Sequence, residues 1–256
     1  MIQFCIRHMP WKGMASDMKI LGIDSSSLVA SVAIVADDIL IAEYTVNYKK
    51  THSQTLLPML DEAAKMVELD LKSLDAIAVS GGPGSFTGLR IGTATAKGLG
   101  LALHKPLIHV PTLDAMAYNL WGCDRLLCPM MDARRNQVYT GLYRCRFGLE
   151  VVKPSCAMDV QELIRELNDT GQPAVFLGDG VSAYRQQMEE GLKIPFDYAP
   201  AHTNRQRAAA VAALGGEYLR QGKTVSAADF RPDYLRQSQA EREREEKERE
   251  QQQGGA

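Results

Sequence analysis

Several features that would assign a protein to a specialised class are missing from this chain of 256 residues. It contains no run of about 18 apolar residues, which is the minimum for a membrane-spanning helix. Its 29 Lys and Arg residues are balanced by 31 Asp and Glu residues and form no basic stripe, so high-affinity binding to nucleic acid is not indicated. These absences favour an ordinary globular protein of one or two domains without membrane contact.

Cysteine is too scarce and too scattered to organise the fold. The cysteines at positions 5, 123, 128, 145 and 156 are odd in number, and Cys123 and Cys128 have no second ligand pair or nearby histidine that would complete a zinc site. Reduced thiols and a cytoplasmic location are expected. The first 17 residues have neither the apolar stretch of a signal peptide nor the arginine-rich pattern of a transit peptide, and we expect them to form a disordered extension.

Familiar catalytic and nucleotide-binding motifs are missing as well. The chain has no P-loop, no GxGxxG and no HExxH. Ser85 does not stand in a GxSxG elbow. Metallopeptidase and serine-peptidase chemistry are therefore disfavoured.

The most distinctive stretch that is present covers residues 80–103. A short apolar run at 75–79 predicts a buried strand, residues 81–88 are rich in glycine, and residues 88–103 have a helical pattern that Ser85 or Thr87 would cap. A strand, a glycine-rich turn and a helix start present backbone N–H groups to an anion. The alternative is a loop that needs glycine only in order to turn, and the local sequence leaves both open.

A second polar turn precedes this stretch. Residues 18–24, 28–36 and 39–47 predict a meander of three strands, with Asp24 and three serines in its first turn. An acidic residue that ends a strand before hydroxyl residues is typical of hairpins that hold phosphate and metal, whereas the alternative is local Asx-type hydrogen bonding. The candidate phosphate loop consists of Asp24, Ser25, Gly82, Gly84 and Ser85.

Two helices have apolar residues beyond a single stripe. One runs from a capping-box pattern at Thr51 to about Val67 with Pro58 inside it, and the other covers residues 88–103. His52 is expected to take part in the capping turn rather than in ligand binding. Since such helices are usually buried on two sides, we expect a second surface for a protein partner. The candidate interface consists of Leu56, Met59, Leu60, Ala63, Met66, Arg90, Ala94, Lys97 and Leu101.

Strands and helices alternate through the rest of the chain. We predict strands at 105–110, 125–132, 137–145, 150–156 and 174–177. We also predict a helix that Thr112 caps, a helix from Val160 that Asp159 caps, another helix after Gly180, a last helix at 205–220, and a return to the core at 227–234. This order predicts an α/β fold with two subdomains, residues 18–121 and 122–236. Residues 237–256 form a charged, low-complexity tail that cannot bury a core.

Five segments together resemble the TsaB (YeaZ) family, which belongs to the bacterial tRNA threonylcarbamoyladenosine system. They are residues 20–25, 52–58, 80–92, 131–139 and 177–180. The resemblance implies two RNase H-like subdomains of the actin–hexokinase–chaperone superfamily. It also implies a heterodimer with the paralogous transferase TsaD, association with the ATPase TsaE, and a homodimer when the chain is alone.

The resemblance implies a role without chemistry of its own. The complex transfers threonylcarbamoyl to N6 of adenosine 37 in tRNAs that read ANN codons, and TsaB is its non-catalytic dimerisation and activating subunit. The chain would then meet tRNA only through the complex. It would require no cofactor, with weak ATP or ADP binding at the glycine loop as the open alternative.

TsaD-like catalysts hold their metal with two histidines in an HxxxH pattern, which would fall on Thr112 and Met116 here. A threonine and a thioether do not make a hard-metal site, so the sequence predicts no catalytic metal and no enzyme. The alternative function is an ATP-dependent small-molecule kinase of the same superfamily, for which Asp132 and Asp179 are the candidate carboxylates. A tRNA-binding module is a third option.

Overall fold

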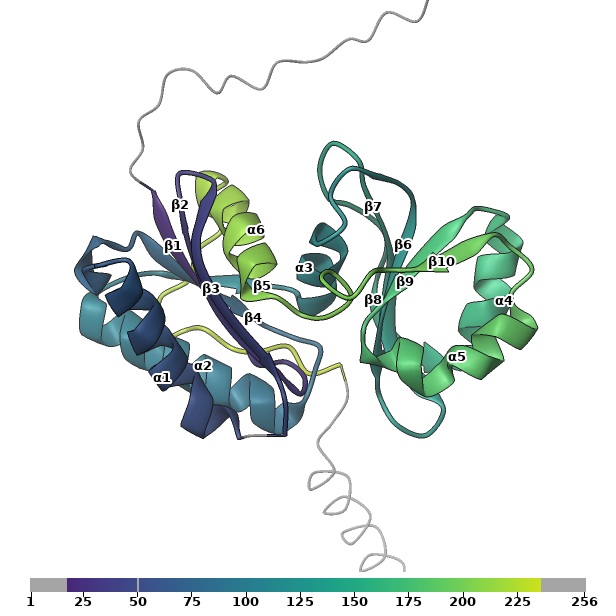
Figure 1. Cartoon of the computed structure of the whole chain (residues 1–256), viewed down its shortest axis with the longest axis horizontal. Helices are drawn as coiled ribbons and strands as arrows, with labels where there is room; N and C mark the ends of the chain where they lie inside the picture. The colour runs from purple at the N-terminus through teal and green to yellow at the C-terminus, as the bar shows by residue number, and fades with distance from the viewer. Residues whose placement is uncertain (1–17, 50, 236–256) are drawn as a thin grey trace, which may run out of the picture.

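The computed structural model describes residues 18–49 and 51–235 (Figure 1). The expectations for the extension at 1–17 and for the tail at 237–256 lie outside the described residues. Within them the chain forms two five-stranded sheets, each covered by helices.

The first sheet has the strand order β3-β2-β1-β4-β5. β1, β2 and β3 are antiparallel neighbours, whereas β4 and β5 run parallel to β1. β1, β2 and β4 read as nearly continuous apolar runs because helices cover both faces of the sheet. The strands are β1 (Lys19–Asp24), β2 (Val29–Ala36), β3 (Ile39–Asn47), β4 (Ala76–Ser80) and β5 (Leu107–Val110).

The second sheet repeats the first. Its order, β10-β9-β6-β7-β8, is the same topology with β6 in the place of β1, and the parallel and antiparallel pairs correspond one to one. This repetition confirms the prediction of two RNase H-like subdomains. The strands are β6 (Cys123–Asp132), β7 (Gln137–Cys145), β8 (Glu150–Asp159), β9 (Ala174–Leu177) and β10 (Phe196–Tyr198). The sequence pattern does not predict the short strand β10.

Three helices belong to each repeat. They are α1 (His52–Met66), α2 (Phe86–Leu103) and α3 (Thr112–Tyr118) in the first, and α4 (Val160–Thr170), α5 (Asp179–Gly191) and α6 (Ala208–Arg220) in the second, with a 3₁₀ turn at Leu71–Ser73. α1 and α2 pack side by side on one face of the first sheet.

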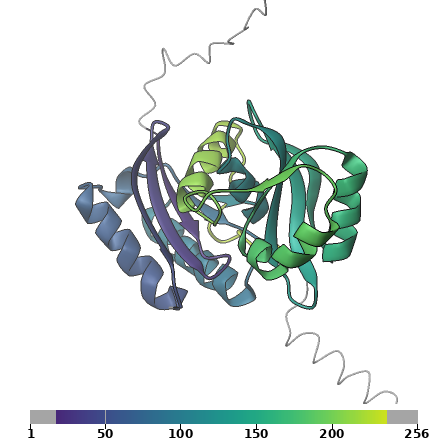
Figure 2. The same cartoon turned by 45° about the vertical axis from the view of Figure 1, so that its right-hand side comes forward.

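The third helix of each repeat crosses to the other sheet. α3 packs on β6 and β7, while α6 packs on β1, β2, β4 and β5, and the two helices touch between the sheets (Figure 1, Figure 2). The division at residue 121 therefore describes the strands but not α6, which lies with the first subdomain. Residues 227–234 also return to the first core, as expected, where Ala227 and Phe230 are buried.

Capping differs from the sequence prediction at two helices, α1 and α3, and agrees with it at α2 and α4. Ser85, not Thr87, caps α2 by accepting a hydrogen bond from the Gly88 N–H at 3.3 Å. Thr51 stands at the N-cap of α1, but its side chain makes no capping bond, and Thr112 is the first residue of α3 rather than its cap. Asp159 caps α4 as predicted.

Among residues 18–49 and 51–235, no helix is both long and apolar enough to cross a bilayer.

Candidate functional site

Asp24 ends β1 inside the first subdomain, where its carboxylate is completely enclosed. Ser80 at the end of β4 donates to Oδ2 at 2.5 Å, and both the N–H and the hydroxyl of Ser26 donate to Oδ1 at 2.9 and 2.7 Å. Burial raises the pKa of Asp24, against the lowering effect of these three bonds. The local Asx-type bonding considered above is thus present, and the phosphate-binding alternative stays a prediction.

Ser80 and Ser26 are not singled out by the sequence motifs. A signal was available for Ser80, because β1 and β4 are adjacent parallel strands and Ile23 is registered with Val79. The polar residue that ends each strand is therefore brought to the same sheet edge.

The serine turn supports the start of α2 instead of leaving an open cradle. Ser25 is buried and donates from Oγ to the Gly88 carbonyl at 2.8 Å. The Ser85 N–H donates to the Ser26 carbonyl at 2.7 Å. A Cβ at Gly84 would lie 2.3 Å from that same carbonyl, so glycine is required for the two turns to approach.

The carboxyl-terminal part of the described chain closes the other side of the glycine loop. Residues 223–235 form a segment that we call the strap. Its Asp233 N–H donates to the Gly81 carbonyl, and a Cβ at Gly82, where φ is +120°, would lie 2.2 Å from the Asp233 carbonyl oxygen. Nothing in the sequence pattern predicts this contact.

His52 lies beside the start of α2, where its Cδ2 would be 3.4 Å from a Cβ at Gly88. Its Nε2 is 2.7 Å from the Ser27 carbonyl, which ties the start of α1 to the serine turn. The contact differs from the predicted role of His52 in the capping turn of α1, because its partner is a backbone group of the first hairpin.

The expected partner residues separate into a buried set, an exposed set and Lys97, which is partly exposed. Leu56, Met59, Leu60 and Ala63 are buried in the first core together with residues of β1 and β2, so their assignment to a partner surface is wrong for this fold. The reason is that the side of α1 that carries Leu56, Leu60 and Ala63 faces its own sheet, and Met59 lies next to it.

The exposed set stands at solvent-exposed positions of α1 and α2, the two helices that pack side by side. Met66 and Leu101 are 68% and 58% exposed, and Arg90 and Ala94 are exposed on α2. Leu57, 51% exposed and absent from the predicted set, lies on another side of α1, because the nine residues between it and Met66 turn the helix by about half a circle.

Lys97 is occupied by the strap. Its Nζ donates to the carbonyl of Ala228 at 2.9 Å and to that of Phe230 at 3.4 Å. Arg90 stacks over the Phe86 ring at 4.1 Å, and the ring of Tyr234 in the strap contacts the same Phe86 ring, with centroids 4.8 Å apart.

The positions expected for metal-binding histidines lie in packed surroundings. Thr112 and Met116 are 0% and 1% exposed, and Met116 packs with Leu113 and Leu127 between α3 and the second sheet. No group of three or more His, Cys, Asp or Glu residues in the described ranges is arranged to hold a metal ion.

The two carboxylates of the kinase alternative lie in the second subdomain. Asp132 accepts from the Tyr184 hydroxyl at 3.0 Å and pairs with Arg134 at 3.1 Å. Asp179 begins α5, and burial raises its pKa. The Asp132 carboxylate is therefore bound by two residues of its own subdomain.

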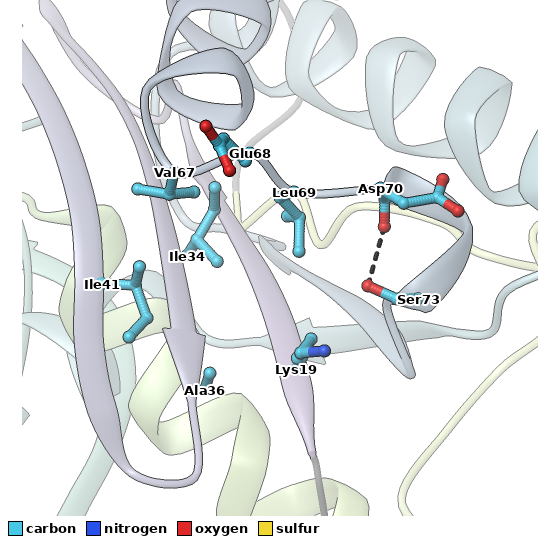
Figure 3. A pocket seen from close by; sticks show the side chains of 9 residues that line it. All are labelled: Lys19, Ile34, Ala36, Ile41, Val67, Glu68, Leu69, Asp70 and Ser73. Atoms are coloured by element: carbon cyan, nitrogen blue, oxygen red, sulfur yellow. Dashed lines mark hydrogen bonds between the residues drawn. The ribbon is translucent and has the colours of Figure 1, made fainter.

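A pocket of about 440 Å³ lies away from the glycine loop, beyond the end of α1 (Figure 3). Ile34 and Ile41 from the strands face Val67 and Leu69 across it. Glu68 and Asp70, from the segment that carries Val67 and Leu69, also line it. The rest of its lining includes Lys19 and Ser73, and none of the nine lining residues belongs to the predicted site.

Comparison with known proteins decides the family. A protein of Bacillus subtilis (strain 168) described as "tRNA threonylcarbamoyladenosine biosynthesis protein TsaB" is 36% identical over 228 residues, which cover 88% of this chain and 96% of that protein. The chain belongs to the TsaB family.

Other relatives agree with the TsaB assignment. The protein of the same description from Escherichia coli (strain K12) is 31% identical over 87% of this chain and 96% of its own. A crystal structure described as an uncharacterized protein with similarity to peptidase YEAZ, from Pseudomonas aeruginosa, is 25% identical with a TM-score of 0.74, over 86% of this chain and 100% of that one. The family model of TsaD, described as tRNA N6-adenosine threonylcarbamoyltransferase, matches residues 40–244.

Proposed function

We propose that this chain is the non-catalytic, activating subunit of the complex that transfers threonylcarbamoyl to N6 of adenosine 37 in tRNAs that read ANN codons. Its direct partner is the TsaD transferase, the ATPase TsaE joins the assembly, and tRNA is met only through the complex. The names of the TsaB relatives and the match to the TsaD family model support this proposal. The chain alone forms a homodimer and requires no cofactor.

The observation that carries the non-catalytic role is the packing at Thr112 and Met116. Two histidines at these positions would have to displace a threonine that is 0% exposed and a methionine whose Cε lies against Gly178 of the second subdomain. Thr112 further donates its N–H to the Gly82 carbonyl at 2.8 Å. Thr112 and Met116 therefore connect the glycine loop, α3 and the second sheet, and their role is to pack these parts together.

The surface that fits a partner is the outer side of α1 and α2. Leu57 and Met66 expose large apolar side chains on different sides of α1, and Leu101 does so on the stripe of α2 that also carries the small, exposed Ala94. Exposed apolar residues on two neighbouring helices are typical of a protein–protein contact.

The test is co-purification with the cognate TsaD, followed by threonylcarbamoyl transfer to tRNA with each subunit omitted in turn. We expect TsaD to need this chain and this chain to transfer nothing alone. Turnover of ATP on a small molecule by the isolated chain would favour the kinase alternative instead. Failure of the chain both to bind TsaD and to change its turnover would overturn the proposal.

A matched pair of variants locates the contact. Met66→Asp combined with Leu101→Asp places two charges on the outer side of α1 and α2, whereas Phe147→Asp places one at an 80% exposed apolar residue of the second subdomain. We expect the first variant to remain folded and to lose TsaD, and the second to bind TsaD as the unmodified chain does.

A further inference from the structure

Two of the cysteines face each other on neighbouring strands. Cys123 at the start of β6 is registered with Cys145 at the end of β7. Residues directly opposite in an antiparallel pair have Cα atoms about 4.5–5.5 Å apart, which lies within the range of about 4.4–6.8 Å that a disulfide spans. The thiols are free in the structure.

The two side chains share one side of the sheet. Both pack against the cluster that contains Leu127 and Tyr143. Cys145 is buried there, and burial raises its pKa to about 11, with Glu217 and then Cys123 adding to the shift. Cys123 is partly exposed, so a reagent in solution reaches it first.

The pair lies where the chain passes from the first subdomain to the second. The Gly122 N–H donates to the Cys145 carbonyl at 2.6 Å, and the Cys123 N–H donates to the Leu120 carbonyl at 3.1 Å. Two residues before Cys123, Trp121 contacts the Tyr118 ring at the end of α3. A covalent bond at this point would fix the entry of the chain into β6.

We propose that Cys123 and Cys145 are a redox-sensitive dithiol that forms a reversible disulfide by exchange with a low-molecular-weight disulfide such as oxidised glutathione. The Cys123 thiolate attacks one sulfur of the reagent, and the first glutathione thiolate leaves. The Cys145 thiolate then attacks the Cys123 sulfur, and the second glutathione leaves. Two protein thiols are oxidised, one reagent disulfide is reduced, and the two thiol protons end on the two glutathione molecules.

The other described cysteines provide the control. Cys128 on β6 bonds to Thr140 at 3.4 Å, and the residue registered with Thr140 on β8 is Cys156. Strand β7 therefore separates Cys128 from Cys156, and neither stands opposite a cysteine. Oxidation should select Cys123 and Cys145 although all four residues lie on the same sheet.

The experiment uses the full chain with Cys5→Ser, treated with oxidised glutathione, then alkylated and mapped by mass spectrometry without reduction. We expect a linked peptide pair that contains Cys123 and Cys145, lost after treatment with dithiothreitol and retained in Cys156→Ser. In Cys145→Ser the reaction should stop at a glutathione adduct on Cys123. In Cys123→Ser the buried Cys145 should stay unmodified.

A physical readout accompanies the mapping. The bridge should raise the thermal midpoint by roughly 5–10 °C, reversibly with dithiothreitol, because it closes a loop of the unfolded chain. In a Trp11→Phe background it should also quench Trp121 fluorescence. A stable glutathione adduct on Cys123 of the unsubstituted pair, a link to Cys128 or Cys156, or full resistance to oxidation would each overturn the proposal. This inference does not depend on the proposed function.

Discussion

The guanidinium group of Arg207 binds the carboxylate of Glu43, which lies 164 positions earlier in the sequence. Nε donates to both carboxylate oxygens at 3.2 Å, and Nη2 donates to Oε2. Glu43 also accepts from the Ala209 N–H at 3.3 Å, at the start of α6. The edge strand β3 is thereby tied to the chain that returns from the second subdomain, which holds α6 on the first sheet.

This pair is predicted to contribute far more than a surface ion pair. Arg207→Ala leaves a carboxylate that is only 11% exposed without its cation, so we expect a loss of about 2–4 kcal/mol in the free energy of unfolding. Arg220→Ala is the control, since its pair with Asp38 is nearly half exposed and should cost less than about 1 kcal/mol. Urea unfolding measures both, and equal losses would contradict the prediction.

Asp24 makes the stability of the fold depend on pH. Burial raises its pKa above 3.8 in the folded chain, so the folded state keeps its proton to a higher pH than the unfolded chain does. The free energy of unfolding should therefore fall as pH rises from about 4 through the raised pKa. The fall amounts to about 1.4 kcal/mol for each pH unit that separates the folded pKa from the unfolded pKa. Asp24→Asn should remove this share of the fall and leave the shares of Asp114 and Asp179, whose pKa values burial also raises.

Ser80→Ala tests the same carboxylate by removing one of its hydrogen-bond donors. The Ser80 hydroxyl stabilises the ionised carboxylate, so removing it should raise the pKa further and extend the fall to higher pH. Urea unfolding between pH 4 and 8 tests both variants. A decline in Asp24→Asn as steep as in the parent would show that another group is responsible.

Met59 and Met66 are both methionines on α1 with opposite predicted roles. Met59 is 9% exposed in the first core, whereas Met66 is 68% exposed. Met59→Asp should unfold or strongly destabilise the chain, by about 3 kcal/mol or more, because a carboxylate is buried without a partner. Met66→Asp should stay within about 0.5 kcal/mol of the parent and weaken the TsaD complex. Thermal unfolding and co-purification separate the two effects.

The strap is predicted to depend on one aromatic residue. Phe230 is 1% exposed and packs into the first core. Its carbonyl and that of Ala228 accept hydrogen bonds from the Lys97 ammonium group. Phe230→Ala should cost about 3–5 kcal/mol and should raise hydrogen exchange in residues 225–234. Tyr234→Ala is the control, since Tyr234 is 41% exposed and its ring contacts the Phe86 ring at the start of α2 rather than the core. Unchanged exchange in Phe230→Ala would show that the backbone bonds alone hold the strap.

Much of the secondary structure is accessible from local pattern. β7 and β9 have the bounds that the pattern predicts, and Ser85 and Asp159 cap the helices that follow them. β10 escapes prediction because three residues carry too short a pattern, and its position comes from pairing with β9. The capping prediction at Thr51 is wrong because sequence spacing specifies which atoms are near, not which rotamer the packed chain selects.

The sequence by itself determined the α/β alternation, the glycine-rich turn before α2, and the family, since these rest on local periodicity and on motifs. Only the tertiary structure decided which side of α1 faces solvent, that α3 and α6 exchange sheets, and that the strap covers the glycine loop. The physical reason is that periodicity identifies an apolar face but not the surface that buries it. Contacts such as Glu43 with Arg207 join residues that no local pattern relates, and they become definite only when the whole chain has closed.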